Sequence, residues 1–270
     1  MRAEGVETAR PLADRVVVVT RAAAQAGALR DALEADGAHV VVMPTIVIEP
    51  PADWAPLDAA LDRAADYRWV IFTSVNGVEM TRRRLAERDR GAEVLRGRRI
   101  AAIGPATARA LEAWGHPAEL VPEEYVAEGL ARRLAEVVAA GDRILLPRAA
   151  ETRDLLVREL ASLGARVDEV AAYRTRPAEG TGAELRALLA RGAVDVVTFT
   201  SSSTVRHFAA LFAPDERAAL MRGVRVACIG PVTRDTAESV GLATAIMPAE
   251  YTIPALAAAI ARHYEREKRS

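Results

Sequence analysis

The sequence is poor in two residues on which several classes of protein depend. Lysine occurs once in 270 residues, as Lys268 in the C-terminal segment EREKRS, which argues against a Schiff-base lysine or a pyridoxal phosphate enzyme. Cysteine also occurs once, as Cys228. A single cysteine excludes an intrachain disulfide and is typical of a reducing compartment, so we expect a cytoplasmic protein.

Several binding and catalytic motifs are also missing. The sequence has no G-x-x-x-x-G-K-[ST] loop for nucleotide phosphates, no G-x-G-x-x-G loop for a dinucleotide and no G-x-S-x-G elbow for a serine hydrolase. The histidines have neither HxxxH nor HxH spacing, so we predict no metal site; they are His39, His116, His207 and His263.

Charge and hydropathy argue against two further kinds of partner. The net charge of −1 favours neither nucleic acid nor an anionic membrane surface. Apolar runs such as VVVVT at 16–20 are too short to cross a bilayer. Residues 1–14 lack the apolar core of a secretion signal, and we interpret them as a loose N-terminal arm.

What the sequence does contain is one pattern used twice. The stretch IGPATARALEAWG at 103–115 returns as IGPVTRDTAESVG at 229–241, a shift of 126 residues. The FTS triplets at 72–74 and 199–201 are shifted by 127 residues, as are Arg21 and Arg148. So constant a shift across half of the chain indicates an internal duplication.

Each half alternates short β-branched runs with amphipathic helical stretches. The predicted strands of the first half are 16–20, 39–43, 69–73, 99–103 and, weakly, 118–121, and its helices include 25–35 and 106–114. The second half repeats the scheme with RILLP, ARVDEVAAYRT, DVVTFT, RVACI and TAIM. Because strands that alternate with helices form parallel sheets covered on both faces, we predict an α/β protein with two doubly wound parallel-sheet domains.

The domain boundaries are predicted from two extended segments at the same phase of the repeat. PTIVIEPP at 44–51 and AAYRTRP at 171–177 are both strand-like and both end in proline, which cannot donate to a sheet ladder. We interpret them as a two-stranded linker. The chain would then form domain 1 from residues 1–46 and 176–270 and domain 2 from residues 47–175.

Polar residues follow the predicted strands at equivalent points of both halves. Carboxyl ends of parallel strands and the helix N-termini after them form the ligand-binding edge of such a sheet. Glycine allows close approach of a ligand, hydroxyls stand beside free N–H groups, and arginine binds carboxylates through two hydrogen bonds. The candidate ligand-binding residues are Arg21, Thr73, Ser74, Asn76, Gly104, Thr107, Arg148, Ser201, Ser202, Ser203, Gly230 and Thr233.

Two interpretations of these loops stay open at this point. Ser and Thr after a strand are also the ordinary N-caps of a helix, and that role alone could account for any single one of them. Their recurrence in both halves favours instead two facing walls of a small-molecule site between the domains. The ligand inferred from such walls is an extended molecule with several acidic groups.

Tyr173 is a separate candidate, because it lies in the second linker segment, AAYRTRP. We expect its phenol at the opening between the domains, where it can donate a hydrogen bond or a proton without carrying charge at neutral pH. The alternative is a strand tyrosine that packs on the linker.

The combination of FTSxNGV, IGPATARAL, IGPVTRDT, the tyrosine in YRT and the two-domain repeat resembles the uroporphyrinogen-III synthase family over about residues 15–264. The chain departs from many bacterial members at Ala149 and Ala150, where glycines often follow the strand-end arginine. Arg153 is therefore a further candidate for the role of Arg148.

The resemblance implies a function. Members of this family convert linear hydroxymethylbilane to uroporphyrinogen III by loss of water, inversion of the terminal ring and closure of the macrocycle, without a metal or cofactor. In the family the tyrosine that matches Tyr173 is the favoured proton donor to the departing hydroxyl. The hydroxyls that match Ser74, Thr107, Ser201, Ser202 and Thr233 would contact the substrate, and the protein would be a monomer.

Two other classes of function remain possible from the residues alone. The architecture is equally typical of a non-catalytic two-domain protein that binds a polyanionic metabolite. An enzyme acting on nucleotide sugars is a third, weaker candidate. Turnover of hydroxymethylbilane distinguishes a synthase from a non-catalytic binding protein, and a nucleotide-binding screen tests the third candidate.

Overall fold

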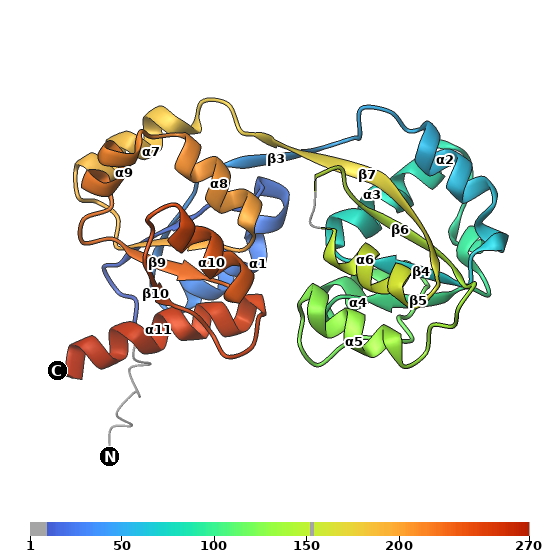
Figure 1. Ribbon diagram of the computed structural model, residues 1–270. Helices are drawn as coiled ribbons and strands as arrows, with labels where there is room; N and C mark the ends of the chain where they lie inside the picture. Colours follow the sequence, from blue (N-terminus) through green and yellow to red (C-terminus); the bar gives the residue numbers. More distant parts are fainter. Residues whose placement is uncertain (1–9, 152–153, 270) are drawn as a thin grey trace, which may run out of the picture. The chain divides into compact units, whose positions relative to one another are not determined.

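The computed structural model describes residues 10–151 and 154–269, and they fall into two compact units (Figure 1). Domain 1 consists of the described residues up to Val47 together with those from Arg176 on. Domain 2 consists of Ile48–Thr175.

Domain 1 is built on a five-stranded sheet with the order β10-β9-β8-β1-β2. Its neighbouring strands pair in parallel: β1 (Val16–Val19), β2 (His39–Val42), β8 (Val196–Phe199), β9 (Arg225–Cys228) and β10 (Thr244–Ile246). In order of appearance along the chain this is 2-1-3-4-5, the order of flavodoxin-like doubly wound sheets.

Helices cover both faces of this sheet because the strand side chains alternate. Val17 and Val19 point into an apolar cluster with α1 (Ala23–Ala35) and α11 (Ile253–Arg269), whereas Val18 points into a cluster on the other face. That second face carries α7 (Thr181–Ala190), α8 (Ser202–Ala210) and α10 (Pro231–Ser239), and α9 (Pro214–Leu220) lies beside α7. Burial on both faces explains the continuous apolar character of these strands.

Domain 2 has a sheet with the order β3-β7-β6-β4-β5. Its strands are β3 (Ile46–Glu49), β4 (Trp69–Phe72), β5 (Arg99–Ala102), β6 (Arg143–Ala149) and β7 (Arg166–Pro177). The predicted weak strand at 118–121 is reduced to one parallel bridge, between Leu120 and Ala101. When that bridge is counted as a fifth strand position, the order β7-β6-β4-β5-Leu120 in domain 2 matches the order β2-β1-β8-β9-β10 in domain 1.

The helices of domain 2 also form two layers. One face carries α2 (Ala55–Asp62), α3 (Val75–Glu87) and α4 (Pro105–Ala113), and the other carries α5 (Ala127–Ala135) and α6 (Leu155–Ser162). Two short 3-10 helices, η1 (Ala64–Asp66) and η2 (Ala92–Leu95), lie in the connections. The predicted α/β class with doubly wound parallel sheets is thereby confirmed.

The two linker segments differ from each other. The first forms the short strand β3, but AAYRTRP is the second half of the 12-residue strand β7 and so continues the sheet of domain 2. Ala149 still pairs with Tyr173 across β6 and β7. The two predicted linker strands do lie next to each other as β3 and β7, and β7 in addition continues the sheet of domain 2 through its ladder with β6.

Part of the expected N-terminal arm belongs to the core of domain 1. Leu12 is fully buried in the cluster of α1 and α11, and its N–H donates to the carbonyl of Asp36 at 3.0 Å. The interpretation of residues 1–14 as loose was thus wrong for residues 10–14. Residues 1–9 lie outside the described part of the chain.

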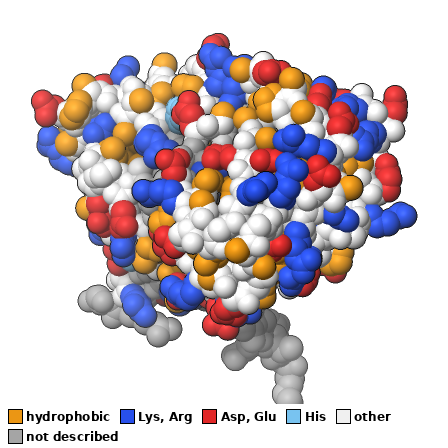
Figure 2. Space-filling view, turned by 45° about the vertical axis from the view of Figure 1, so that its right-hand side comes forward, with side chains coloured by type: hydrophobic (Ala, Val, Ile, Leu, Met, Phe, Trp, Pro, Cys, Tyr) orange, Lys and Arg blue, Asp and Glu red, His pale blue; other side chains and the backbone are white. Residues whose placement is uncertain are grey.

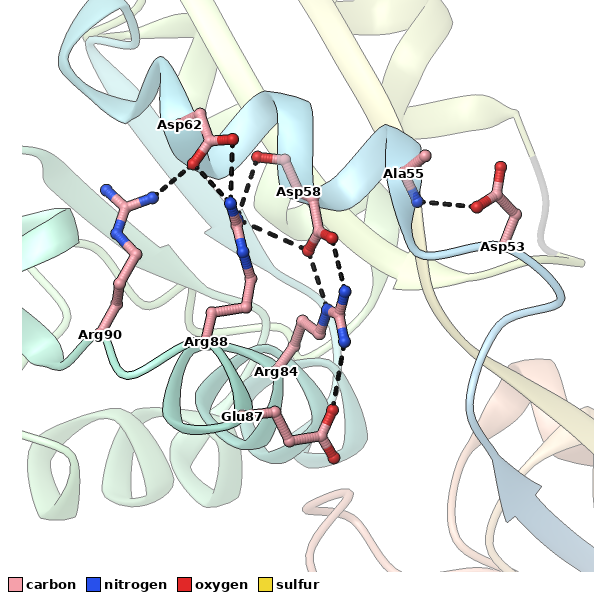
Figure 3. Close-up of polar contacts among 8 residues, drawn as sticks. All are labelled: Asp53, Ala55, Asp58, Asp62, Arg84, Glu87, Arg88 and Arg90. Carbon is pink, nitrogen blue, oxygen red and sulfur yellow. Dashed lines mark hydrogen bonds and ion pairs between the residues drawn. The ribbon is translucent and has the colours of Figure 1, made fainter.

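A network of ion pairs joins α2 to the C-terminal half of α3 (Figure 3). The Arg84 guanidinium binds Asp58 through both carboxylate oxygens, at 2.8 and 2.6 Å, and lies over the Trp54 ring at 5.1 Å. Arg88 and Arg90 both bind Asp62. This network supplies polar contacts between α2 and the end of α3.

The surface charge and the apolar character of the helices bear on whether the chain has a nucleic-acid or membrane partner. On the face shown in Figure 2, acidic and basic side chains are interspersed rather than gathered by sign. Among the described residues, none of the helices combines the length and apolar character needed to cross a bilayer.

Candidate functional site

The candidate ligand residues lie at the topological switch point of each sheet. In domain 2 the chain reverses its direction of growth between β4 and β6, and in domain 1 between β1 and β8. Loops after the strands at such a point leave a crevice for ligands. We describe the site of each domain separately.

In domain 2 the loops after β4 and β5 lie side by side. The N–H of Ile103 donates to the carbonyl of Phe72 at 3.0 Å, which extends the strand ladder to the start of both loops. Ser74 is the N-cap of α3, and its Oγ accepts the N–H of Gly77 at 3.0 Å. Thr73 and Asn76 flank this cap, and all three polar side chains remain partly exposed.

Tyr173 joins this site through its phenol. Its Oη lies 3.0 Å from Ser74 Oγ, and either atom can be the donor. The residue is only 8% exposed. The phenol is thus held at the carboxyl ends of β4 and β6 by the same serine that caps α3, rather than on an exposed linker.

The surroundings of the phenol act on its pKa in opposite directions. Burial raises the pKa of Tyr173, while hydrogen bonds from Ser74 and Asn76 and the positive charge of Arg148 lower it. The net shift is upward, so the phenol is protonated at neutral pH. It can donate a proton, and the groups that lower its pKa are those that would stabilise the phenolate left behind.

Arg148 lies at the end of β6, as its place in the repeat predicts, but its guanidinium is turned into the protein. The residue is 4% exposed, and its Nε lies 3.3 Å from Glu169 Oε1. Its positive charge lowers the pKa of the Tyr173 phenol. Arg153, predicted to share its role, lies outside the described residues.

The start of α4 is shaped by a tyrosine that the sequence alone did not assign. Gly104 is the N-cap, in extended backbone that any residue adopts, so its conformation does not demand glycine. A Cβ there would instead lie 3.2 Å from Cβ of Tyr125. Thr107, in the first turn, is 4% exposed and has no side-chain hydrogen bond to another described residue.

Domain 1 repeats this arrangement. The N–H of Ile229 donates to the carbonyl of Phe199 at 2.9 Å, and Ser201 caps α8 by accepting the N–H of Thr204 at 3.2 Å. Gly230 caps α10, and a Cβ there would lie 3.1 Å from Cγ of Tyr251. Thr233 is 5% exposed, again without a side-chain hydrogen bond among the described residues.

The other two serines after β8 also have local partners. Ser202 Oγ lies 2.8 Å from Thr236 Oγ1 and also donates to the carbonyl of Val232, so it joins α8 to α10. Ser203 has a backbone role, because its carbonyl meets Nδ1 of His207. The hydroxyl of Ser201 is thus used in the cap of α8, whereas the hydroxyl of Ser202 is engaged between two helices.

Arg21 differs from its counterpart Arg148. It follows β1, and its guanidinium contacts Gln25 Oε1 at 3.3 Å, with no carboxylate within ion-pair distance among the described residues. Desolvation lowers the pKa of its guanidinium below the usual range. A desolvated cation without an acidic partner is the arrangement that a carboxylate ligand would complete.

Sequence reasoning missed Tyr125 and Tyr251 as part of these loops, although their positions are 126 residues apart like the turns they contact. The repeat was the available signal. Of metal sites, the described residues contain no group of three His, Cys, Asp or Glu side chains able to hold an ion.

Two doubly wound domains, each with capped helix starts, buried threonines and an arginine at its switch point, place the chain in the class of two-domain α/β proteins with parallel sheets. Comparison with known proteins narrows this class. The uroporphyrinogen-III synthase HemD family matches residues 27–258.

Individual relatives cover nearly the whole chain. The uroporphyrinogen-III synthase of Synechococcus elongatus is 37% identical over 256 residues, which cover 93% of this chain and 96% of that protein. The uroporphyrinogen-III synthase of Chlorobaculum parvum is 28% identical over 249 residues, which cover 92% and 98% of the two chains. The chain belongs to the uroporphyrinogen-III synthase family.

Solved structures agree in fold. A mutant uroporphyrinogen III synthase of Thermus thermophilus matches with a TM-score of 0.66 at 20% identity, covering 93% of this chain and 99% of that one. The Helicobacter pylori uroporphyrinogen-III synthetase matches with a TM-score of 0.54 at 17% identity, covering 90% and 96%.

Proposed function

We propose that this chain catalyses the uroporphyrinogen-III synthase reaction and is a lyase of tetrapyrrole biosynthesis. It would convert the linear tetrapyrrole hydroxymethylbilane to uroporphyrinogen III by loss of water, inversion of the terminal ring and ring closure. The observation that carries the proposal is the 37% identity, over 93% of this chain, with a protein of that name.

The geometry of the strand ends suits a flexible polycarboxylate. Each domain presents a capped helix start, a Gly-Pro-x-Thr turn and a threonine hydroxyl with no partner among the described residues. Arg21 adds a desolvated guanidinium without an acidic partner in the described part of the chain. N–H groups and hydroxyls of this kind bind carboxylates without metal, and we propose that the chain acts without metal or cofactor as a monomer.

In the chemical step the enzyme must orient the terminal ring of the substrate more than it must make the substrate reactive. Hydroxymethylbilane closes spontaneously to the type I isomer, so a catalyst must hold the terminal ring in the inverted geometry while water leaves. Fixed contacts to the carboxylates supply that orientation. We assign Tyr173 as the donor of the proton to the departing hydroxyl, because its phenol is protonated and lies at the switch point of domain 2.

Proton balance over the cycle is closed. The phenol proton leaves with the hydroxyl as water, and the ring carbon that forms the last bond then loses a proton. That second proton restores the phenol. No oxidant, reductant or co-substrate is required.

The test is the isomer ratio formed from enzymatically generated hydroxymethylbilane. The wild-type chain should give type III product, and Tyr173→Phe should reduce its rate by about a hundredfold or more. A wild-type chain that gives only type I product while still binding the bilane would leave the alternative, a non-catalytic binding protein. Undiminished type III formation by Tyr173→Phe would remove Tyr173 from the mechanism.

A further inference from the structure

Two serines occupy equivalent positions in the two domains, but only one of them contacts a phenol. Ser74 and Ser201 lie 127 residues apart and cap α3 and α8 with nearly the same backbone, φ −164° and −163°. Each accepts an N–H three residues on, at 3.0 and 3.2 Å. Ser74 alone also meets a tyrosine, at 3.0 Å.

The difference comes from one residue in the neighbouring strand. Tyr173 lies in β7 at the repeat position that Ile46 holds in β3 of the first half. Ile46 is an apolar side chain and offers Ser201 no hydrogen-bond partner, and Ser201 Oγ instead lies 3.4 Å from Thr204 Oγ1. The duplication therefore contains one serine that only caps and one that caps and holds a phenol.

The hydrogen-bond inventory of Ser74 limits what the pair can do. A serine hydroxyl has one proton and two lone pairs, and one lone pair of Ser74 is occupied by the N–H of Gly77. If Ser74 donates its proton to Tyr173 Oη, the phenol keeps its own O–H for a ligand. If the phenol donates to Ser74 instead, its proton is not available to the substrate.

We propose that Ser74 is a positioning residue for Tyr173: by donating its hydroxyl proton to the phenol oxygen, it directs the phenol O–H to the substrate and stabilises the phenolate left after proton transfer. The inference rests on the proposed function, because it assigns Ser74 a part in that reaction. Ser74 thus acts through Tyr173 rather than on the bilane itself.

The other groups around the phenol support this role. Asn76 from α3 and the positive charge of Arg148 from β6 favour the phenolate in the same sense as Ser74. Burial works against the phenolate. In so enclosed a place, a hydrogen bond to the developing charge is worth more than in water.

The experiment compares matched serine variants. Ser74→Gly removes the hydroxyl but retains most of the capping preference, so it separates the phenol contact from the cap. We expect Ser74→Gly and Ser74→Ala to lower kcat for type III formation by about tenfold with little change in KM. Thr252→Ala is the control for a lost cap, because Thr252 Oγ1 accepts the N–H of Ala255 at the start of α11. It should lower Tm with kcat unchanged, and Ser74→Thr should restore kcat.

A second measurement asks whether the effect passes through Tyr173. In the Tyr173→Phe background there is no phenol oxygen to hold, so Ser74→Gly should cost nothing further in kcat. An equal loss of kcat in that background, or equal kcat losses for Ser74→Ala and Thr252→Ala, would overturn the inference.

Failure of the inference and failure of the proposed function have different signatures. If the wild type forms type III product and Ser74→Gly matches its kcat, only the positioning role is lost. If the wild type forms type I product alone, the proposed function is lost, and the inference with it.

Discussion

The two domains are copies of one module, and the comparison between them shows which features the fold requires and which it does not. Both keep the strand order, the serine caps and the Gly-Pro-x-Thr turns with a tyrosine against the glycine. They differ at the phenol of Tyr173, where the other copy has Ile46. The shared features are those that cap and pack the helices of either copy, and the unshared phenol is the reason why we assign the proposed proton transfer to domain 2.

The interiors beneath the two capped helices have also diverged. Domain 1 buries a chain of threonines, in which Thr20 Oγ1 donates to the carbonyl of Thr198 at 2.7 Å and Thr45 Oγ1 to that of Thr204 at 3.2 Å. At the equivalent positions domain 2 has Pro147, Ile71, Ala172 and Gly77. A Cβ at Gly77 would lie 3.0 Å from the carbonyl oxygen of Pro147, so the first turn of α3 packs more closely on its sheet.

The largest difference expected between the copies concerns the strand-end arginines. Arg21→Met should raise KM for the bilane by about tenfold with little loss of Tm, because its guanidinium has no acidic partner among the described residues. Arg148→Met should mainly lower stability, by about 1–3 kcal/mol, because that guanidinium is buried beside Glu169. Steady-state kinetics and thermal unfolding measure both.

The exposed Arg191→Met of domain 1 is the control for lost charge and should change neither quantity. If Arg21→Met behaved like this control, its assignment to substrate binding would fall.

The second difference concerns the contact between the first two helices of each module. Asp58 and Arg84 of domain 2 correspond to Leu185 and Leu211 of domain 1, which belong to one apolar cluster. Arg84→Leu alone should cost about 1–2 kcal/mol of stability, since it leaves the carboxylate of Asp58 without that partner. The double variant Asp58→Leu/Arg84→Leu should recover much of the loss, because apolar pairs replace part-buried ion pairs well.

Thermal unfolding of Asp58→Leu, Arg84→Leu and the double variant gives the coupling free energy between Asp58 and Arg84. If the losses of stability in the two single variants simply added in the double variant, an apolar pair could not replace the ion pair between α2 and α3.

A third prediction concerns a feature that the copies share. Gly104→Ala and Gly230→Ala should each destabilise the chain by about 1 kcal/mol, because the new Cβ meets a tyrosine ring. The cost should fall when the ring is removed, as in Gly230→Ala/Tyr251→Ala, because the nearest atoms there are ring atoms of Tyr251. Gly27→Ala is the control: it lies in α1 with nothing within 4 Å of the new Cβ, so it should be neutral or slightly stabilising. Unequal effects at Gly104 and Gly230 would show that the two turns are not equivalent.

The smallest effect expected is a difference in pH dependence. Hydrogen bonds from Arg84 hold the pKa of Asp58 below its usual value. The stability that Asp58 contributes is therefore present above its unfolded-state pKa of about 3.9 and is lost as the pH falls through the lower folded-state value. The gap in Tm between wild type and Asp58→Asn should narrow from pH 6 towards pH 3. A Tm difference that stays constant with pH would mean that the charge of Asp58 contributes nothing to the stability of the folded state.

Much of this organisation was predictable from particular residues. The constant offset between the two halves indicated the duplication, and β-branched runs such as VVVVT predicted strands buried on both faces. The predicted strand at 118–121 largely failed to form, because its run is short and followed at once by Pro122. Arg21 and Arg148 looked alike in sequence, yet one lacks an acidic partner in the described residues and the other is buried beside Glu169.

The sequence by itself determined the class of fold, the repeat and the set of polar residues at the strand ends, because periodicity and composition are local properties of the chain. Only the tertiary structure decided that Tyr173 meets Ser74, that Tyr125 and Tyr251 cover the turn glycines, and that Leu12 belongs to the core. Those contacts join residues far apart in the chain, and they depend on sheet register and side-chain packing, which no local pattern of residues specifies.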